Sequence, residues 1–568
     1  MPRAPWSAVP WPAVLLGAGC LWLATPPVPS AGLALLVVPG LAVQFALATQ
    51  ERRPLLACWL LGALHVGAFS WSLRHVTLVG WLLIALLGGC YHAAFAAAVR
   101  TCWRPGRALV PVLAAAVATA GTAWLRAEMP GIAYPHGQPC HGLYEWPWAL
   151  GAVALGGEPL ANGLLGALGA ALVLVWRGWR LGAPPLRAAL ATAAGAVVLL
   201  VGASVLGLPG PRSASAPTVA VAAVEPGFHP IDAFQDAQDR GALQRRWQDL
   251  IRARLLAPTQ RIAGAAADAP PDLVLWPESS VPYMAVTDRA GDLRFPGLRG
   301  AITLADRVRL CVGGEWLRDR DTGAVTPIAA LLGPTGDLLD HHEKQRLVPA
   351  GEFLPLVGWL PQAFADWLRK LAQTTVGIPN AVPGRARPPL RLAPGTGGEA
   401  EGAPFAAMVC YDNAFPSVVA GAVAAGARFV AVLSNEAWYR GGGELDQLAA
   451  ITVLRAVATA TPIVRCTTDG RTMAVDRDGR VLAALPAAPT PTPEPRVLRV
   501  DLPLGDGRLP PMAWAHPWLG WGAAIAVLLA CLLGRLHGRG PWARLLRLGR
   551  STAEVGDGPR PQASSGGS

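Results

Sequence analysis

The chain has 568 residues, of which 52% are hydrophobic and only 15% are charged, and its mean hydropathy is positive. This composition excludes an ordinary soluble enzyme of the same size and indicates a protein that lies at least partly in a membrane. The net charge of +11 does not predict nucleic-acid binding, because arginines in the loops of a membrane protein explain much of the excess. The nine cysteines are scattered without metal-ligand spacing, so we expect no disulfide framework, no metal site and no cofactor.

Eight apolar runs are long enough to cross a hydrocarbon core, which takes about 20 residues in a helix. They predict seven spans before a long soluble segment and one after it, near residues 13–25, 31–48, 54–71, 77–98, 107–125, 146–176, 186–208 and 517–536. The first run is short, so a cleaved signal peptide is an alternative interpretation of it. Because it lacks a clear small-residue cleavage site and further spans follow directly, we interpret it as a retained helix.

Arginine placement predicts the orientation of these spans, because basic residues in short loops stay on the cytoplasmic side. If the eight spans alternate, one side receives Arg3, Arg52 and Arg53, the arginines from 100 to 107 and from 177 to 187, and those of the C-terminal tail. We therefore divide the chain into a membrane domain (1–208), a domain outside the cytoplasm (209–511), a C-terminal span (512–538) and a basic, partly disordered cytoplasmic tail (539–568).

The outer segment alternates strand-like and helix-like stretches. It opens with a strand over 217–226 and an amphipathic stretch in which Leu243, Trp247, Leu250 and Ile251 recur at helical spacing. Further strands are predicted at 272–276, 308–316, 327–332, 405–410, 428–434 and 462–467, and helices at 413–425 and 444–460. This order predicts an α/β layered domain. The Pro-, Gly- and Arg-rich segment 378–404 has no periodicity and is interpreted as a mobile loop or insertion.

Three reactive side chains stand in or beside strand-like runs of this domain. They are Glu278 in VLWPESS, Lys344 in LLDHHEKQRLVPAGEFLP and Cys410 in PFAAMVCYDNAFP. Singly, each has an ordinary structural explanation, since free cysteine is often buried and a Glu or Lys is often a solvated charge. Trp276, in the same run as Glu278, is better explained as core than as pocket wall.

Together the three residue types are sufficient for acyl transfer. A thiol has a pKa near 8.5 and needs a base to become a nucleophilic thiolate, while a cation stabilises the thiolate and the oxyanion that follows. Glu278 would be the base, Lys344 the cation and Cys410 the nucleophile. A helix beginning after Cys410 would place the sulfur near backbone N–H groups, with the Tyr411 amide as a second oxyanion donor.

The motifs WPES, EKQRLVPAGEFLP, VCYD and SNEAWY, in the order Glu, Lys, Cys, resemble those of the nitrilase superfamily. With seven apolar runs before the domain and one after it, the chain is similar to the membrane-embedded apolipoprotein N-acyltransferase family. This resemblance implies eight spans and an αββα sandwich with Glu278, Lys344 and Cys410 as the catalytic triad. It also implies supporting roles for four residues: Glu352, Tyr411, Asp412 and Trp438.

The activity implied by the resemblance is transfer of an acyl chain from a membrane phospholipid to the α-amino group of an S-diacylglyceryl-cysteine lipoprotein, through a cysteine thioester. The implied location is a bacterial inner membrane, with the catalytic domain in the periplasm and no nucleic acid among the partners. The apolar stretch 351–368 is interpreted equally well as an interfacial lid or as an ordinary amphipathic core helix.

Several positions depart from the family pattern: Gln345, Ala350, Asp412, Asp469 and the loop AEMPGIAYPHGQP. They leave the triad whole but leave open the lipid preference, the acceptor and the level of activity. Two alternatives therefore stand beside the transferase. One is a membrane-tethered amidase or nitrilase, and the other is a degenerate homologue that only binds lipid or partner proteins.

Overall fold

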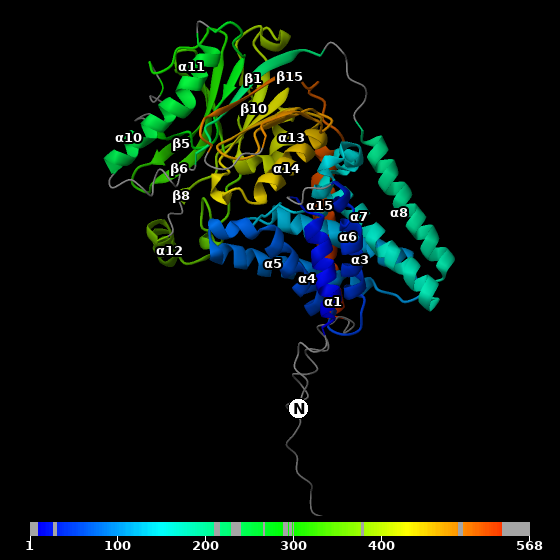
Figure 1. The fold of residues 1–568 in the computed structure, drawn as a ribbon. Helices are drawn as coiled ribbons and strands as arrows, with labels where there is room; N and C mark the ends of the chain where they lie inside the picture. The colour runs from blue at the N-terminus through cyan, green and yellow to red at the C-terminus, as the bar shows by residue number, and fades with distance from the viewer. Residues whose placement is uncertain are drawn as a thin grey trace, which may run out of the picture.

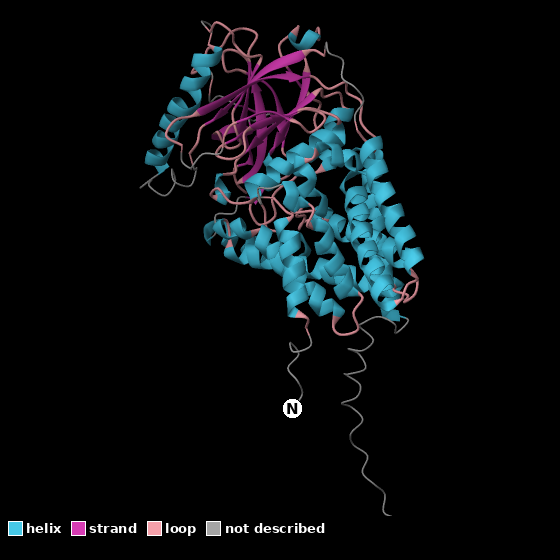
Figure 2. Cartoon of the chain, turned by 45° about the vertical axis from the view of Figure 1, so that its right-hand side comes forward, coloured by secondary structure: helices cyan, strands magenta, loops and turns pink. Residues whose placement is uncertain are grey.

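The structure is a computed structural model that describes residues 9–26, 31–208, 216–228, 240–264, 267–287, 293–294, 298, 300–375, 380–486 and 492–536. A bundle of long helices forms one half of the molecule, and an α/β domain with its strands gathered together sits on one end of that bundle (Figures 1 and 2). The chain enters the α/β domain after the first eight helices of the bundle and returns to the bundle with its last described helix.

The bundle helices coincide with the apolar runs of the sequence. They are α1 (Trp11–Leu23), α2 (Ala31–Ala34), α3 (Val37–Ala48), α4 (Pro54–Phe69), α5 (Leu78–Cys102), α6 (Leu109–Glu128), α7 (Gly151–Leu181), α8 (Leu186–Leu206) and α15 (Met512–Leu536). Among the described residues, five helical segments are long and apolar enough to cross a membrane, and the apolar helices at 11–23, 32–48 and 54–69 are shorter. The structure therefore contains candidate membrane spans, as expected, whereas the number of eight spans is not confirmed.

Two of the predicted runs are not single regular helices. The run 31–48 turns at Leu35 and Leu36, where α2 ends and α3 begins. Pro39 lies in the first turn of α3, a position that needs no N–H donor, so it suits a helix start and cannot continue the preceding helix. The run 146–176 begins as a 3₁₀ turn, η4 (Pro147–Leu150), and α7 is interrupted at Gly157, whose φ of 70° lies in the left-handed region.

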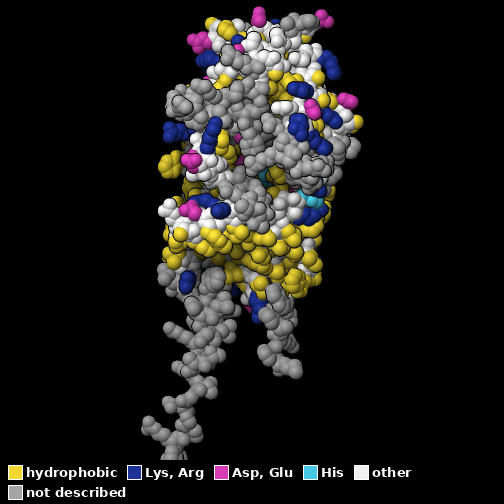
Figure 3. All heavy atoms as spheres, turned by 90° about the vertical axis from the view of Figure 1, so that its left-hand side faces the viewer, with side chains coloured by type: hydrophobic (Ala, Val, Ile, Leu, Met, Phe, Trp, Pro, Cys, Tyr) yellow, Lys and Arg dark blue, Asp and Glu magenta, His cyan; other side chains and the backbone are white. Residues whose placement is uncertain are grey.

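The outside of the bundle is apolar. Figure 3 shows a belt of hydrophobic side chains around the helical half, with charged side chains concentrated on the α/β half above it. Large apolar side chains on α5, α8 and α15 are exposed, including Leu83, Val198 and Leu529 at 60%, 68% and 52%. A contiguous apolar belt of this size is stable only against lipid.

The α/β domain contains two sheets. The first runs in the order β15-β1-β2-β5-β3-β4, and β6, paired with β5, also pairs with β7 and β8. Its strands are β1 (Thr218–Glu225), β2 (Leu273–Leu275), β3 (Val281–Thr287), β4 (Leu293–Arg294), β5 (Arg309–Asp319), β6 (Ala324–Leu332), β7 (Leu338–Glu343), β8 (Asn380–Ala381) and β15 (Arg496–Pro503). The second runs β14-β13-β12-β11-β10-β9, with β9 (Leu390–Arg391), β10 (Pro404–Val409), β11 (Phe429–Ser434), β12 (Ile463–Thr467), β13 (Met473–Val475) and β14 (Val481–Ala484).

The strands at the centre of the second sheet are apolar on both faces, because both faces are covered. β10, β11 and β12 are parallel, and buried parallel strands are typically continuous hydrophobic runs. Val409 and Leu433 point into the core between the two sheets, whereas Met408 and Val432 point to the opposite face, which is covered by helices. This alternation follows from the two-residue period of a strand.

Four helices complete the layers. α10 (Arg240–Ile251) and α11 (Ala257–Ala263) cover the outer face of the first sheet, and α13 (Pro416–Ala424) and α14 (Glu444–Thr459) cover that of the second (Figure 1). The predicted α/β domain with αββα layering is thus present. The segment predicted as a loop at 378–404 contributes β8 and β9, whereas the C-terminal tail lies outside the described residues.

The α13 and α14 layer lies between the second sheet and the membrane bundle. Its apolar side chains belong to the same continuous core as those of the bundle. Gln447 on α14 donates a hydrogen bond to the backbone oxygen of Phe69 at the end of α4, at 2.8 Å. Arg455, also on α14, forms an ion pair with Glu158 of α7. The α/β half is therefore fixed to the bundle by buried contacts rather than by linkers alone.

Candidate active site

Glu278 lies at the end of a buried strand. β2 ends at Leu275, and Trp276 is fully buried with its indole N–H donating to Thr259 Oγ1 at 2.8 Å. The interpretation of Trp276 as core is therefore confirmed. Beside this turn, a Cβ on Gly313 of β5 would meet the Cα of Glu278 at 2.4 Å. Only a glycine lets the two backbones approach this closely, so Gly313 fixes where the Glu278 turn lies.

Lys344 follows β7 and is completely buried. Its Nζ donates to Glu278 Oε1 at 2.9 Å and to Glu352 Oε1 at 2.5 Å. Burial alone would lower the pKa of Lys344, but the two carboxylates raise it well above its ordinary value. Lys344 therefore remains protonated at neutral pH, and its chemistry is that of a cation rather than of a base.

The second oxygen of each carboxylate, in Glu278 and in Glu352, accepts a hydrogen bond from a backbone N–H. Glu278 Oε2 accepts from the N–H of Asn435 at 2.9 Å, and Glu352 Oε2 accepts from the N–H of Val348 at 2.8 Å. Burial raises the pKa of Glu352, with Lys344 opposing that rise. Each carboxylate thus has one oxygen on Lys344 and one on a backbone amide, which fixes its orientation.

Cys410 begins the turn that follows β10. Its φ of 48° is left-handed, an unfavourable conformation for a residue with a side chain, and it opens the 3₁₀ turn η8 (Cys410–Ala414) ahead of α13. Burial, and then Glu278, raise the pKa of the Cys410 thiol to about 12, while Lys344 and a hydrogen bond from Ser434 lower it. The structure therefore places Glu278 and Lys344 in direct contact and brings both near Cys410, whose side chain is partly buried.

Tyr411 links the Cys410 turn to the membrane domain. Its hydroxyl donates to the backbone oxygen of Ala133 at 2.8 Å, in the loop that follows α6. Its ring packs edge-on against Phe415 with 5.2 Å between centroids and stacks toward His136 at 6.2 Å. The weakly matching family segment 127–139 thus lies directly beside the candidate nucleophile.

Asp412 is a buried clamp between two catalytic segments. Oδ1 accepts from the N–H groups of Gln345 and Arg346 at 2.9 and 2.8 Å, directly after Lys344. Oδ2 lies 3.2 Å from His342 Nε2 and 3.3 Å from the N–H of Val409. The departure from Glu to Asp is compatible with this role, because the short side chain reaches all of these groups.

The other expected positions are more peripheral. Trp438, on η9 (Ala437–Tyr439), is 42% exposed at the rim of the site. Ala350 has a φ of 59° in the turn before Glu352, and Asp469 is buried in the turn after β12.

The sequence reasoning missed four polar residues around the triad. Ser434 and Glu436 stand at the end of β11, Arg465 lies in β12, and Glu315 lies in β5. Arg465 is fully buried and pairs with Glu436, while burial, followed by Glu278 and Glu352, raises the pKa of Glu315 to about 7. A charged residue inside an apolar strand pattern, such as Arg465 in PIVRCT, was the available signal.

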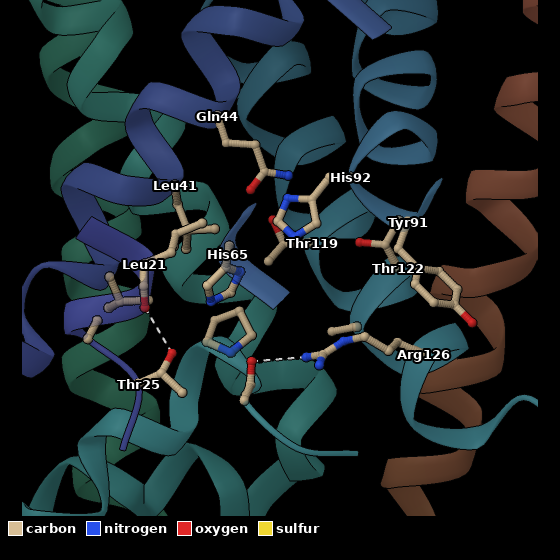
Figure 4. A pocket seen from close by; sticks show the side chains of 15 residues that line it. Leu21, Thr25, Leu41, Gln44, His65, Tyr91, His92, Thr119, Thr122 and Arg126 are labelled. Atoms are coloured by element: carbon tan, nitrogen blue, oxygen red, sulfur yellow. Dashed lines mark hydrogen bonds between the residues drawn. The ribbon is translucent and has the colours of Figure 1, made fainter. Parts of the chain in front are cut away.

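Two hollows flank this region. A groove of about 240 Å³ lies between residues 129–133 of the membrane domain and residues 345–353 of the catalytic domain, and it is lined mainly by apolar side chains with Arg346 at its edge. A smaller cavity of about 50 Å³ lies inside the bundle among Gln44, His65, His92 and Arg126 (Figure 4). Within the described residues, no three His, Cys, Asp or Glu side chains gather in a way that could hold a metal.

Comparisons with known proteins match both halves of the chain. A family model described as carbon-nitrogen hydrolase matches residues 218–507, and one described as apolipoprotein N-acyltransferase N-terminal domain matches residues 17–172. The apolipoprotein N-acyltransferase of Geobacter metallireducens is 28% identical over 302 residues, which cover 51% of this chain and 52% of that one. That of Caulobacter vibrioides is 27% identical over 526 residues, covering 88% and 87%.

The extent of these matches differs between relatives. The chain spans about half the length of the relatives from Geobacter metallireducens and Chlorobaculum tepidum, at 52% and 58%, and most of the one from Caulobacter vibrioides. Among solved structures, an amidase from Nesterenkonia sp. is 20% identical with a TM-score of 0.32, covering 52% of this chain and 94% of that one.

Proposed function

The chain belongs to the carbon-nitrogen hydrolase family, and from this premise we propose that it is a phospholipid:apolipoprotein N-acyltransferase. Its substrates would be a membrane phospholipid as acyl donor and a lipoprotein with an N-terminal S-diacylglyceryl cysteine as acceptor. The observation that carries the proposal is the position of Cys410. Its partly buried side chain lies near Glu278 and Lys344, and the adjacent Tyr411 hydrogen-bonds to a loop of the membrane domain.

In the first half-reaction Glu278 takes the proton of the Cys410 thiol as the sulfur attacks the ester carbonyl of the phospholipid. Because the resting thiol has a pKa of about 12, proton transfer to a nearby base is needed for attack at neutral pH. Lys344 and the Tyr411 backbone N–H stabilise the oxyanion. Cleavage of the ester C–O bond, with the proton returned from Glu278, releases a lysophospholipid and leaves a thioester on Cys410.

In the second half-reaction the α-amino group of the acceptor attacks the thioester carbonyl. Glu278 accepts the amine proton, the C–S bond breaks, and the thiolate recovers a proton to regenerate the thiol. Lys344 stays protonated throughout, because Glu278 and Glu352 raise its pKa well above its ordinary value. Glu352 holds the ammonium in place when Glu278 carries a proton, so the site keeps a carboxylate on Lys344 at every step.

Access from the bilayer favours lipid substrates. Taking a long acyl chain fully into water would cost on the order of 10 kcal/mol at about 0.8 kcal/mol per CH₂. The groove of about 240 Å³ between the two halves of the molecule offers a path that avoids this cost, since residues 129–133 of the membrane domain form one of its walls. An enzyme for small soluble amides would have no need of the apolar bundle.

We place the protein in the bacterial inner membrane with the α/β domain in the periplasm. The arginines between the apolar runs support this orientation, because they fall on one side when eight spans alternate. For the three shorter helices to complete eight spans, they would cross with help from the neighbouring loops or from local thinning of the bilayer.

The test uses purified full-length protein with phospholipid vesicles and an S-diacylglyceryl-cysteine peptide, followed by mass spectrometry of all products. We expect equal amounts of lysophospholipid and N-acylated peptide from the wild type and neither from Cys410→Ala. Release of ammonia from small amides without acyl transfer would favour an amidase instead. Tight lipid binding with no product would indicate a protein that only binds.

A further inference from the structure

A second group of polar side chains lies beside Cys410, at the end of β11 and in β12. The Ser434 hydroxyl lies 3.4 Å from the Cys410 sulfur. Behind it, the guanidinium of Arg465 donates to Ser434 Oγ at 3.1 Å and also pairs with Glu436. Ser434, Glu436 and Arg465 are each completely buried.

The sheet register brings these groups together. β10 and β11 are parallel with Val409 opposite Leu433, so the next residues, Cys410 and Ser434, are neighbours at the same end of the sheet. β12 is parallel to β11 with Arg465 opposite Val432. Since side chains two residues apart in a strand share a face, Arg465 points to the same face as Ser434.

A buried guanidinium is costly unless it is fully paired. Arg465 stands on a face otherwise lined by Val430, Val432 and Ile463, where an apolar residue would pack without this cost. Its Nη1 lies 3.4 Å from Thr452 Oγ1 on α14, and its other contacts are Glu436 and Ser434. The cation is thus held in place by α14 and by the end of β11, close behind the sulfur.

Hydrogen-bond directions fix what Ser434 can do. Arg465 has only donors, so it occupies a lone pair of Ser434 Oγ and leaves the hydroxyl proton for another acceptor. The two acceptors within reach are the Cys410 sulfur and Glu436 Oε1, the latter at 3.3 Å. That oxygen distance is long for an O–H···O bond, and Glu436 already receives Arg465. A negatively charged sulfur is therefore the better acceptor.

We propose that Ser434 is a further catalytic residue, whose hydroxyl donates to the Cys410 sulfur when it becomes a thiolate, and that Arg465 positions this hydroxyl. The proposal rests on the nucleophilic role of Cys410 but not on the identity of the acyl donor. Lys344 already serves two carboxylates, Glu278 and Glu352, so the thiolate gains a donor of its own. The same hydroxyl stabilises the sulfur again when it leaves in the second half-reaction.

The experiment measures the rate of Cys410 alkylation by iodoacetamide between pH 7 and 10 in the full-length protein in detergent, read by mass spectrometry of the peptide that contains Cys410. Because burial raises the pKa of the thiol to about 12, the thiolate is the minor form over this range and the rate follows its population. In Ser434→Ala we expect the rate at each pH to fall by about tenfold, as for loss of one hydrogen bond to a charged group. Ser434→Thr keeps the hydroxyl and should retain the wild-type rate. Arg465→Gln should lower the rate as Ser434→Ala does.

Thr461→Ala is the matched control, because Thr461 is also buried but its hydroxyl bonds the backbone oxygen of Thr459. Its profile should equal that of the wild type. An unchanged alkylation rate in Ser434→Ala would overturn the inference while leaving the proposed transferase intact. No alkylation of Cys410 in the wild type at any pH would overturn both. Should Arg465→Gln fail to fold, the Ala and Thr variants at 434 decide the question by themselves.

Discussion

Asp412 is the residue whose contacts best explain a departure from the family pattern. It accepts hydrogen bonds from the backbone on both sides of the site, after Lys344 and before Cys410. Its short carboxylate is therefore a positioning group that sets the distance between two catalytic segments. A carboxylate in this place needs no chemical step of its own to be required for activity.

Replacing Asp412 by Asn removes the charge and turns an N–H₂ group toward backbone donors. We expect a loss of about 1–3 kcal/mol in the free energy of unfolding and a fall in kcat of roughly tenfold or more, since 1.36 kcal/mol in the barrier is a factor of ten. Thermal unfolding in detergent and the acyl-transfer assay measure the two effects. Asp306→Asn, at an exposed position, is the control. Full activity in Asp412→Asn would contradict the positioning role of Asp412.

Glu315 provides a prediction about pH. Burial, then Glu278 and Glu352, raise its pKa to about 7 in the folded protein, above the value near 4.3 of an unfolded chain. A raised pKa favours the protonated folded state, so this contribution is complete below about pH 4 and is lost as the pH rises through about 7.

Glu315→Gln should therefore stabilise the protein at pH 8 by roughly 1–3 kcal/mol, at 1.36 kcal/mol per pKa unit, and change little at pH 5. Thermal unfolding at the two pH values is the measurement. The surface variant Glu401→Gln should show no such difference. A gain of equal size at both pH values would mean that the ionisation of Glu315 is not its cause.

At the scale of elements, the break in α7 joins the membrane bundle to the catalytic domain. The left-handed Gly157 and the following Pro159 interrupt the helix around Glu158. Glu158 is then free to contact Gln138 and His141 from its own domain and Arg455 from α14. The same helix α14 carries Thr452, which contacts Arg465 behind Cys410.

A double-mutant cycle tests this junction. Glu158→Gln leaves the buried Arg455 without its counter-charge and should cost about 3–5 kcal/mol in the free energy of unfolding. Glu158→Gln combined with Arg455→Met should be more stable than the Gln variant by at least about 1 kcal/mol. Thermal unfolding of the four proteins measures the coupling. Strictly additive losses would show that the pair does not interact energetically.

Helix α12 (Gln362–Thr375) presents an exposed apolar face. Phe364, Trp367 and Leu371 recur at helical spacing and are 49%, 56% and 43% exposed, and Leu360, just before the helix, is 38% exposed. Of the two expectations for this stretch, an ordinary core helix is therefore wrong. Figure 1 shows α12 beside the end of α5, where the bundle meets the α/β domain, so this face is at the height of a membrane surface.

We expect Phe364→Gln with Trp367→Gln to raise KM for phospholipid in vesicles by roughly tenfold or more, because burial of each aromatic is worth about 1.5–3 kcal/mol. The kcat for a short-chain phospholipid free in solution should stay close to that of the wild type. Leu339→Gln, at an exposed position on β7, controls for loss of surface hydrophobicity. Equal losses on both substrates would argue against membrane contact by α12.

At the scale of the whole molecule, local patterns predicted more than long-range contacts did. The apolar runs predicted the helices of the bundle. The position of Glu278, Lys344 and Cys410 beside strands predicted the centre of the candidate site. The roles of Ser434 and Arg465 were not predicted, because only the parallel register of β10, β11 and β12 places these residues close to the Cys410 sulfur. The contact between Glu158 and Arg455 was not predicted for a similar reason, since the two residues lie 297 positions apart in the sequence.

The architecture that results places the proposed nucleophile, Cys410, partly buried at the boundary between an apolar helical bundle and an α/β domain. Tyr411 reaches Ala133, Glu158 reaches Arg455, and Gln447 reaches the end of α4. The membrane half therefore forms part of the frame of the active site. This arrangement is the one we expect of a carbon-nitrogen hydrolase domain that is proposed to act on lipids rather than on soluble amides.

The most direct measurement is a two-step mass analysis of the full-length protein in lipid nanodiscs. With phospholipid alone, the account predicts one added acyl group on the peptide that contains Cys410, cleavable by hydroxylamine as a thioester. After addition of the S-diacylglyceryl-cysteine peptide, that mass should disappear from the protein and appear as an amide on the peptide amine. Acylated peptide formed by Cys410→Ala, or an adduct that is released only to water, would contradict it.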